Sequence, residues 1–431
     1  MSSHDETVVL EGTTLRKVTW RLIPFLLLLY ITAWLDRVNV GFAALQMNQD
    51  LGFGAAVYGF GAGVFFVGYA LCEIPSNLIL ARVGARRWIA RIMITWGLIS
   101  VAMMFVRGQT SFYILRFLLG VAEAGFLPGI IYYLANWYPV AARARAVSWF
   151  MSAIPLSIVI GGPFAGVLLE MNGLLGLKGW QWLFLIEGAP AVILGFVVLF
   201  YLTDTPEHAR WLKPEERTWL SARIKAEQAQ AKTRHGVGLR QALLHPTVWH
   251  LALIMFACQS GSYGLTLWVP QILKGLSGLS DLGVGLISAI PYLGAAIGMV
   301  LIGMSSDRSG ERFLHIAVPC FIAAVGFTGS AFLLSPIPGM IALTVAAIGD
   351  LGSRGPFWAL PGRFLAGSAS AAGIALINTI GSLGGFVGPY AVGLVKASTG
   401  DFTGGLLLLA ALLFVGALMT LRLRRAPALR L

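Results

Sequence analysis

The chain has 431 residues, of which 57% are hydrophobic and only 12% are charged. Soluble domains carry about 25% charged residues, so this composition excludes a soluble globular protein and predicts an integral membrane protein. Helices satisfy their own backbone hydrogen bonds in lipid, so we expect transmembrane helices. The net charge of +12 does not indicate nucleic-acid binding, because the basic residues lie in alternate loops.

Twelve apolar runs of transmembrane length follow one another along the chain. The expected spans are 20–44, 57–81, 88–107, 111–137, 146–169, 180–202, 247–273, 283–304, 313–334, 339–363, 368–396 and 402–422. A polar segment separates the sixth span from the seventh. The predicted fold is therefore all-α, with a six-helix bundle over 1–203, a cytoplasmic linker over 204–245 and a second six-helix bundle over 246–431. The first span is too long for a signal-peptide core, so we expect it to be uncleaved.

The first span contains two adjacent charges, Asp36 and Arg37. A charge near the middle of a bilayer costs about 2.5–3.5 kcal/mol on insertion scales, so it is retained where it faces a cavity or a partner. Adjacent residues of a helix point about 100° apart, so each charge needs a partner on another helix. The alternative is a structural ion pair between the two.

The fourth span carries Arg116 and Glu123, which share a helix face about 10 Å apart along the axis. Counted from the ends of the spans, Asp36 and Arg116 lie at similar depth in the outer part of the membrane, and Glu123 lies near the middle. We therefore predict that Asp36 pairs with Arg116, and that Arg37 faces the central cavity near Glu123. A buried structural role is the alternative for Glu123.

Lysine and arginine are distributed unevenly between the two sides of the predicted spans. With the N-terminus inside, 24 of the 31 basic residues fall on the cytoplasmic side, including Arg363 and Arg430, and only four fall outside. Because basic residues favour cytoplasmic loops, both termini are predicted to be cytoplasmic.

Two sequence motifs recur at an offset of 226 residues. The loop 303–312, between spans eight and nine, aligns with 77–86, between spans two and three, and Gly388-Pro389 aligns with Gly162-Pro163. Such repeats are common in transporters, whose substrate site lies near the midplane where the repeats meet. The two bundles are therefore predicted to be pseudo-symmetric.

These motifs resemble those of a known family. The pattern Gly-x-x-x-Asp-Arg-x-Gly-x-Arg at 303–312 resembles the loop signature of the major facilitator superfamily, from which 77–86 departs at Asn77 and Ala81. The runs 35–39, 116–125 and 355–361 resemble the anion:cation symporter family. That family includes bacterial phthalate, tartrate, glucarate and galactonate permeases, and vesicular glutamate transporters and sialin are similar at the Arg/Glu pair of span four.

The resemblance implies roles for three of the buried charges. Asp36 and Glu123 would be the proton-coupling sites, and Arg37 would anchor the substrate. The chemistry agrees, because the planar fork of an arginine matches a carboxylate. An ionised Glu123 would compete with the substrate for Arg37, whereas a protonated Glu123 would release it.

Other candidates are less sharply defined. Those for the substrate site are Arg116, Tyr69, Gln259, Tyr263, Arg354, Trp358 and Asn378, and those for a cytoplasmic gate are Arg82, Arg86, Asp307, Arg308 and Arg312. Arg354 lies four residues after Asp350, so it either offers a second site for a dicarboxylate or is simply neutralised by Asp350. The other polar candidates could also be packing contacts between helices.

The sequence as a whole predicts a transporter rather than an enzyme, since it shows no nucleophile–base pair and no metal-ligand spacing. We expect a monomeric, multi-pass protein of the bacterial inner membrane that imports a small organic acid with protons and needs no cofactor. Two alternatives remain within this architecture: a carrier of a neutral sugar or drug-like solute, and an organic-anion carrier driven by Na⁺ or voltage.

Overall fold

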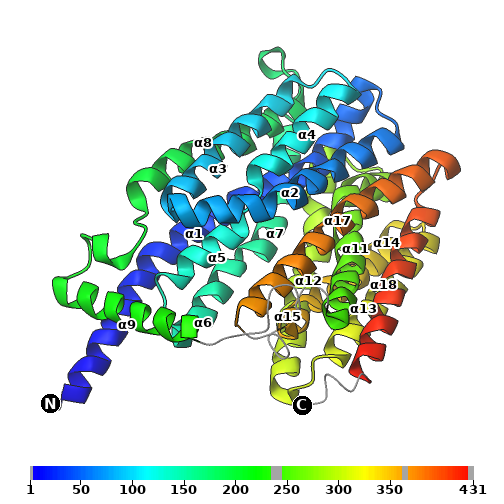
Figure 1. The fold of residues 1–431 in the computed structure, drawn as a ribbon. Helices are drawn as coiled ribbons and strands as arrows, with labels where there is room; N and C mark the ends of the chain where they lie inside the picture. Colours follow the sequence, from blue (N-terminus) through cyan, green and yellow to red (C-terminus); the bar gives the residue numbers. More distant parts are fainter. Residues whose placement is uncertain (1–2, 234–244, 362–366, 426–431) are drawn as a thin grey trace.

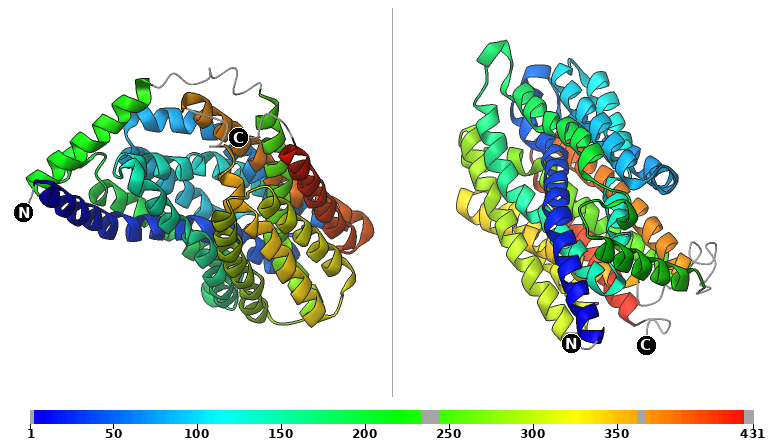
Figure 2. Two further views of the ribbon diagram at one scale, coloured as in Figure 1. Left: turned by 90° about the horizontal axis from the view of Figure 1, so that it is seen from below. Right: turned by 90° about the vertical axis from the view of Figure 1, so that its left-hand side faces the viewer.

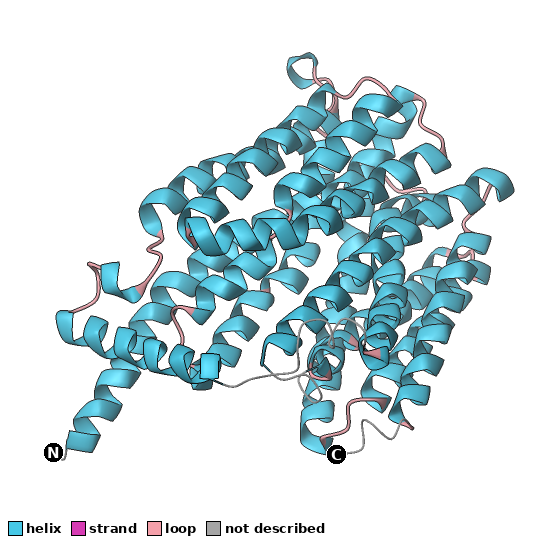
Figure 3. Cartoon of the chain, viewed as in Figure 1, coloured by secondary structure: helices cyan, strands magenta, loops and turns pink. Residues whose placement is uncertain are grey.

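The computed structural model describes residues 3–233, 245–361 and 367–425. These ranges contain helices and loops but no strand (Figure 3). Twelve helical segments are long and apolar enough to cross a membrane, and each overlaps one of the predicted spans. The chain is therefore an all-α membrane protein with twelve spans. Arg363, Arg430 and part of the predicted linker, 234–244, lie outside the described residues.

The first six spans follow one another along the chain and make up its first half (Figure 1). They are α1 (Ser3–Leu51), α2 (Ala55–Val83), α3 (Ala85–Ala102), α4 (Gln109–Glu123) with α5 (Phe126–Ala135), α6 (Val140–Met151) with α7 (Ala153–Leu169), and α8 (Gly179–Tyr201). The beginning of α1 and the end of the last helix lie on the same side of the molecule (Figure 1), which we call the terminal side. The opposite side is the distal side.

The last six spans make up the second half. They are α11 (Pro246–Ser277), α12 (Asp281–Ser309), α13 (Leu314–Phe332), α14 (Pro336–Gly352) with α15 (Arg354–Trp358), α17 (Gly367–Thr399) and α18 (Thr403–Arg424).

The fourth span is broken in its middle by a glycine. Gly125 has a φ of 87°, a left-handed conformation that favours glycine. A Cβ at this position would lie 2.3 Å from the hydroxyl of Ser76, and that hydroxyl donates to the carbonyl of Ala124 at 2.6 Å. The break therefore ends α4 directly after Glu123, and α2 satisfies a carbonyl group at the break.

The two halves meet at pairs of closely packed helices. α2 packs on α17, and α7 packs on α12. A Cβ at Gly59 would lie 2.7 Å from the carbonyl oxygen of Pro389, and one at Gly285 would lie 2.4 Å from that of Gly162. Gly59 and Gly285 are separated by the repeat offset of 226 residues, so equivalent positions make both contacts.

The segment between the halves contains a helix that packs against the first one. α9 (Pro214–Thr233) lies beside the start of α1, as the view from below shows (Figure 2). Lys17 on α1 donates to Glu216 on α9 at 2.5 Å. Just before α9, the ring of Trp211 stacks on that of Trp137, which follows α5, with centroids 5.4 Å apart. α1 therefore extends well before the predicted start of the first span at residue 20, because α9 covers part of this extension.

Candidate functional site

A buried ion pair joins two helices of the first half. Arg37 on α1 donates to the carboxylate of Glu123 at the end of α4, and their side chains are only 10% and 0% exposed. The predicted approach of Arg37 to Glu123 is therefore confirmed. Since a charge removed from water needs a partner, each of these groups compensates the other.

Aromatic rings surround the guanidinium group of Arg37. Its central carbon lies 5.4 Å from the ring centroid of Trp34, 5.5 Å from that of Tyr69 and 5.7 Å from that of Phe65. These distances fall within the range of cation–π attraction, about 6 Å. The cation is thus held in place by rings as well as by Glu123.

Arg37 also contacts the second half. It donates to the hydroxyl of Tyr263 on α11 at 3.4 Å, and the Tyr263 ring stacks near that of Trp34 with centroids 6.4 Å apart. Arg37 and Tyr263 are separated by the repeat offset of 226 residues. The ion pair therefore lies where the two halves meet, at equivalent positions of the repeat.

Asp36 points away from this pair and into the first half. It is fully buried and accepts hydrogen bonds from Ser100 and Trp96 on α3, and from Asn39 at 3.1 Å. Within the described ranges it forms no ion pair. The predicted pairing of Asp36 with Arg116 is therefore wrong, because neutral donors on α3 hold this carboxyl group.

Arg116 instead binds the backbone of α2. Its Nε donates to the carbonyl of Gly61 at 3.3 Å, and its Nη2 to that of Ala62 at 2.9 Å. Small residues permit this contact, since a Cβ at Gly120 on α4 would lie only 1.9 Å from the carbonyl oxygen of Phe65. Similar depth in the membrane thus did not bring Arg116 to Asp36, because the close packing of α4 on α2 provides carbonyl groups first.

A second polar contact joins the halves one helical turn beyond Tyr69. Asn378 on α17 donates to Glu73 on α2 at 2.5 Å, and Glu73 is only 5% exposed. Gln259 lies one turn before Tyr263 on α11 and beside α17, near Gly381. Three of the predicted substrate-site residues, Arg37, Tyr263 and Asn378, therefore form contacts between the halves.

Arg354 and Trp358, two further residues predicted for the substrate site, do not take part in the contacts described above. Arg354 donates to the carbonyl of Cys258 at 2.9 Å and to Ser262 at 2.5 Å, and it lies 3.5 Å from Asp350. All of these partners belong to the second half. Trp358 is 37% exposed and packs edge-on against Phe357.

The predicted gate residues lie on the terminal side and form two separate contacts. Arg312 pairs with Asp307 at 2.7 Å, and Arg86 lies 3.8 Å from Asp204. Arg82 and Arg308 are exposed. Each of these two ion pairs stays within one half or joins it to the segment that follows it, so a gate between the halves stays a prediction.

Three residues that contact the buried charges were not predicted from the sequence: Phe65, Trp96 and Ser100. Phe65 lies between the two buried arginines, 5.7 Å from Arg37 and 5.0 Å from Arg116. Trp96 and Ser100 are four apart on one face of α3 and both donate to Asp36. Two hydrogen-bond donors at this spacing inside an apolar span are the signal that could have indicated an acceptor opposite them.

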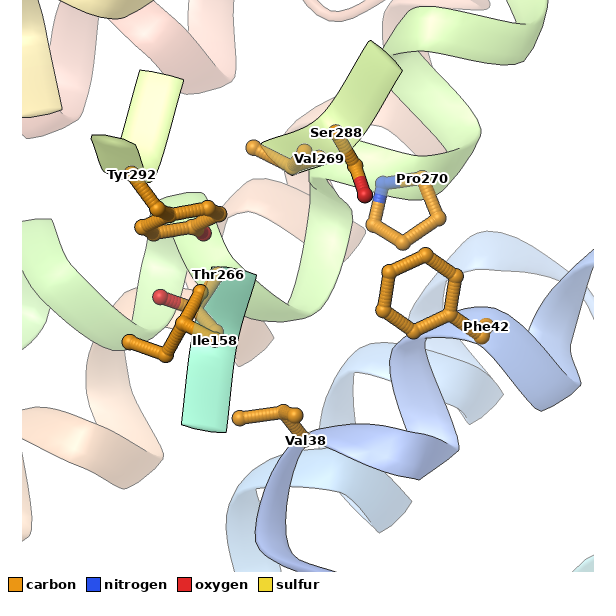
Figure 4. A pocket seen from close by; sticks show the side chains of 8 residues that line it. All are labelled: Val38, Phe42, Ile158, Thr266, Val269, Pro270, Ser288 and Tyr292. Carbon is orange, nitrogen blue, oxygen red and sulfur yellow. The ribbon is translucent and has the colours of Figure 1, made fainter. Parts of the chain in front are cut away.

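A small cavity lies beside this site, between helices of both halves (Figure 4). It is lined by Val38, Phe42, Ile158, Thr266, Val269, Pro270, Ser288 and Tyr292. Its volume of about 10 Å³ is at the lower limit for a single water molecule. The halves therefore pack here too closely to admit an organic acid.

Comparison with known proteins gives a family match over most of the chain. The model of the Major Facilitator Superfamily matches residues 26–389. A protein of Agrobacterium vitis named "Putative tartrate transporter" is 56% identical over 418 residues, which are 97% of this chain and 92% of that protein. A protein of Acinetobacter baumannii named "Quinolone resistance transporter" is 45% identical over 411 residues, 95% and 94% of the two chains.

A solved structure has the same arrangement of helices. It is the crystal structure of a bacterial homolog to the human lysosomal transporter Spinster, in an inward-facing and occupied conformation. The TM-score is 0.78 at 18% sequence identity, and the match covers 94% of this chain and 96% of that chain. At this identity the match concerns the fold alone.

Proposed function

This chain belongs to the Major Facilitator Superfamily, and on that premise we propose that it imports a small organic anion together with protons. The substrate would be a mono- or dicarboxylate, such as tartrate, phthalate or a sugar acid, and the two halves would expose the site alternately to each side. The name of the Agrobacterium vitis relative supports the substrate class. The chain is thus a transporter and not an enzyme.

The observation that carries this proposal is the buried pair of Arg37 and Glu123. Arg37 is the only one of the two that keeps its charge at all physiological pH values. When a proton binds a carboxylate oxygen of Glu123, the charge that neutralises Arg37 is lost. The guanidinium group would then bind the carboxylate of the substrate. The contact of Arg37 with Tyr263 supports a site where the halves meet.

Thermodynamic linkage makes this exchange a coupling mechanism. If protonation of Glu123 strengthens anion binding at Arg37, then anion binding must favour protonation by the same factor. Release of the proton on the other side restores the ion pair and expels the anion. Asp36, next to Arg37 in the chain and fully buried, is the second proposed proton site.

The proposed setting is a bacterial inner membrane. The terminal side would face the cytoplasm, because the basic residues favour that side, and the protein would act as a monomer. Arg82, Arg86, Asp307, Arg308 and Arg312 would then form the cytoplasmic gate. Tyr69, Gln259 and Asn378 would line the substrate site beside Arg37.

Uptake into proteoliposomes under an inward proton gradient tests the proposal. The panel holds tartrate, phthalate, a sugar acid, a monocarboxylate and a neutral sugar, with and without Na⁺ and with and without a membrane potential. We expect accumulation of an acid that depends on the proton gradient and stops when an ionophore collapses it. Accumulation of the neutral sugar alone, or of an acid only with Na⁺ or voltage, would contradict it.

A drug-like solute is the second candidate. The name of the Acinetobacter baumannii relative and the three aromatic rings around Arg37 favour it, because such rings also bind flat aromatic molecules. A quinolone added to the same panel separates the candidates. Competition between the quinolone and the organic acid would place both at one site.

A further inference from the structure

We propose that a groove between α3 and α8 binds the phosphate group of an anionic phospholipid. The groove has a volume of about 280 Å³ and is lined by Arg87, Ala90, Arg91, Ile94, Thr95 and Leu199. It lies apart from the Arg37 site and does not depend on the proposed transport function. α3 and α8 pack tightly on each other at the edge of the first half, away from the second half (Figure 1).

The position of the groove along the spans suits a lipid headgroup. α3 begins at Ala85, so Arg87 and Arg91 lie about 3 and 9 Å from its start at 1.5 Å per residue. α8 ends at Tyr201, two residues after Leu199. The headgroup region is roughly 5–7 Å thick on each side of the hydrocarbon core. If the helix ends mark the surface, Arg87 lies at headgroup level and Arg91 at the boundary with the acyl chains.

Arg87 and Arg91 differ from the neighbouring Arg86 in whether a carboxylate lies near the guanidinium group. Arg86 lies beside Asp204, whereas within the described ranges neither Arg87 nor Arg91 has a carboxylate within ion-pair distance. The Nε of Arg91 is buried and has no hydrogen-bond partner there. A half-buried cation with an unused donor, next to a second cation, is complementary to an anion.

Packing fixes one of these cations and provides an apolar surface beside it. The guanidinium carbon of Arg91 lies 3.9 Å from the ring centroid of Trp88. Ala90, Ile94 and Leu199 give the groove an apolar lining. Phosphate above an apolar surface is the chemistry of a phospholipid, and basic pockets between membrane helices bind such headgroups. Arginines that only extend to the interface, as is common near helix ends, would not require this lining.

Lipid binding to the purified full-length protein tests the proposal. Delipidated protein in detergent is titrated with phosphatidylglycerol, with phosphatidylcholine of the same acyl chains, and with inorganic phosphate. Native mass spectrometry counts bound lipids, and thermal unfolding measures stabilisation. We expect one tightly retained phosphatidylglycerol, at least about tenfold weaker binding of phosphatidylcholine, and little effect of phosphate alone.

Variants locate the site. Arg87→Gln with Arg91→Gln should weaken phosphatidylglycerol binding at least about tenfold, whereas Arg91→Lys should retain part of it. Arg107→Gln is the matched control, since Arg107 is an exposed arginine beyond the other end of the same span. Size-exclusion chromatography confirms that each variant remains folded. Equal binding of the two lipids, equal loss in the control, full binding by the double variant, or phosphate binding that accounts for the whole effect would overturn the proposal.

Discussion

Among the residues that the structure describes, each half contains one buried arginine–carboxylate pair, and the two pairs differ in how they are built. In the first half, Arg37 and Glu123 come from different helices, 86 residues apart in the chain. In the second half, Asp350 and Arg354 are four residues apart on consecutive helical segments. The second pair can form from local geometry alone, whereas the first requires α1 and α4 to pack correctly.

The two pairs also differ in whether their contacts cross from one half of the molecule to the other. Arg37 donates across the boundary between the halves to Tyr263. Arg354 donates to Ser262 and to the carbonyl of Cys258, and Ser262 in turn donates to Asp350, so these contacts remain inside the second half. A group that contacts both halves experiences their relative motion, and a group enclosed in one half does not. We therefore propose that the first pair serves transport and that the second pair serves stability.

The largest effect is expected from Arg37→Lys. Lysine keeps the charge but loses the planar fork, so the substrate carboxylate loses a bidentate contact. We expect substrate affinity to fall about 100-fold, which corresponds to about 2.7 kcal/mol, as measured by equilibrium binding in detergent. Arg116→Lys is the control, because Arg116 binds backbone carbonyls. An equal loss of affinity in both variants would remove the distinction between these arginines.

Glu123→Gln should uncouple transport without abolishing it. The amide cannot carry the transported proton, yet it leaves Arg37 free for the anion. We expect gradient-driven accumulation to disappear while exchange of labelled for unlabelled substrate continues, as measured in the same proteoliposomes. Glu187→Gln is the control, since Glu187 is also buried in a span but belongs to α8. Normal pH dependence of accumulation in Glu123→Gln would show that the proton binds elsewhere.

Much of the fold follows from the sequence, because the bilayer restricts it. An apolar run must become a spanning helix in lipid, so composition and run length alone predict the twelve spans. The approach of Arg37 to Glu123 could be predicted for a related reason. Both are charges that are costly to bury in a membrane span, and each needs a partner of opposite sign.

The direction in which a side chain points could not be predicted in this way. Asp36 and Arg116 lie at similar depth along their spans, which predicted that they pair. Instead, Asp36 accepts hydrogen bonds from Trp96 and Ser100, and Arg116 donates to carbonyl groups of α2. These contacts depend on how the helices are rotated about their axes, which is set by close approaches such as that of Gly120 to Phe65. Rotation is a property of packing over many residues, and no short motif reports it.

Tyr263→Phe tests the contact between the halves with a smaller change. Only the hydroxyl that accepts from Arg37 is lost, and a neutral acceptor for a charged donor contributes little at 3.4 Å. We expect substrate affinity to fall about threefold, since a weak hydrogen bond contributes about 0.5–1 kcal/mol. Tyr292→Phe is the matched control, because Tyr292 is also a buried tyrosine of the second half and, within the described ranges, forms no hydrogen bond with Arg37. The same change in both variants would mean that the Arg37 contact has no special role.

The smallest effect on transport is expected when both members of the second pair are neutralised. Arg354→Gln alone leaves Asp350 buried without its cation, and we expect it to destabilise the protein by about 3–5 kcal/mol. Adding Asp350→Asn removes the uncompensated charge, so thermal unfolding of the double variant in detergent should return towards the wild-type value. Uptake should then stay within about twofold of wild type, because none of the contacts that this pair makes with described residues crosses between the halves. A double variant that is stable but loses affinity for dicarboxylates while retaining it for monocarboxylates would instead make Arg354 the anchor for a second carboxylate. The two pairs would then act together on one substrate.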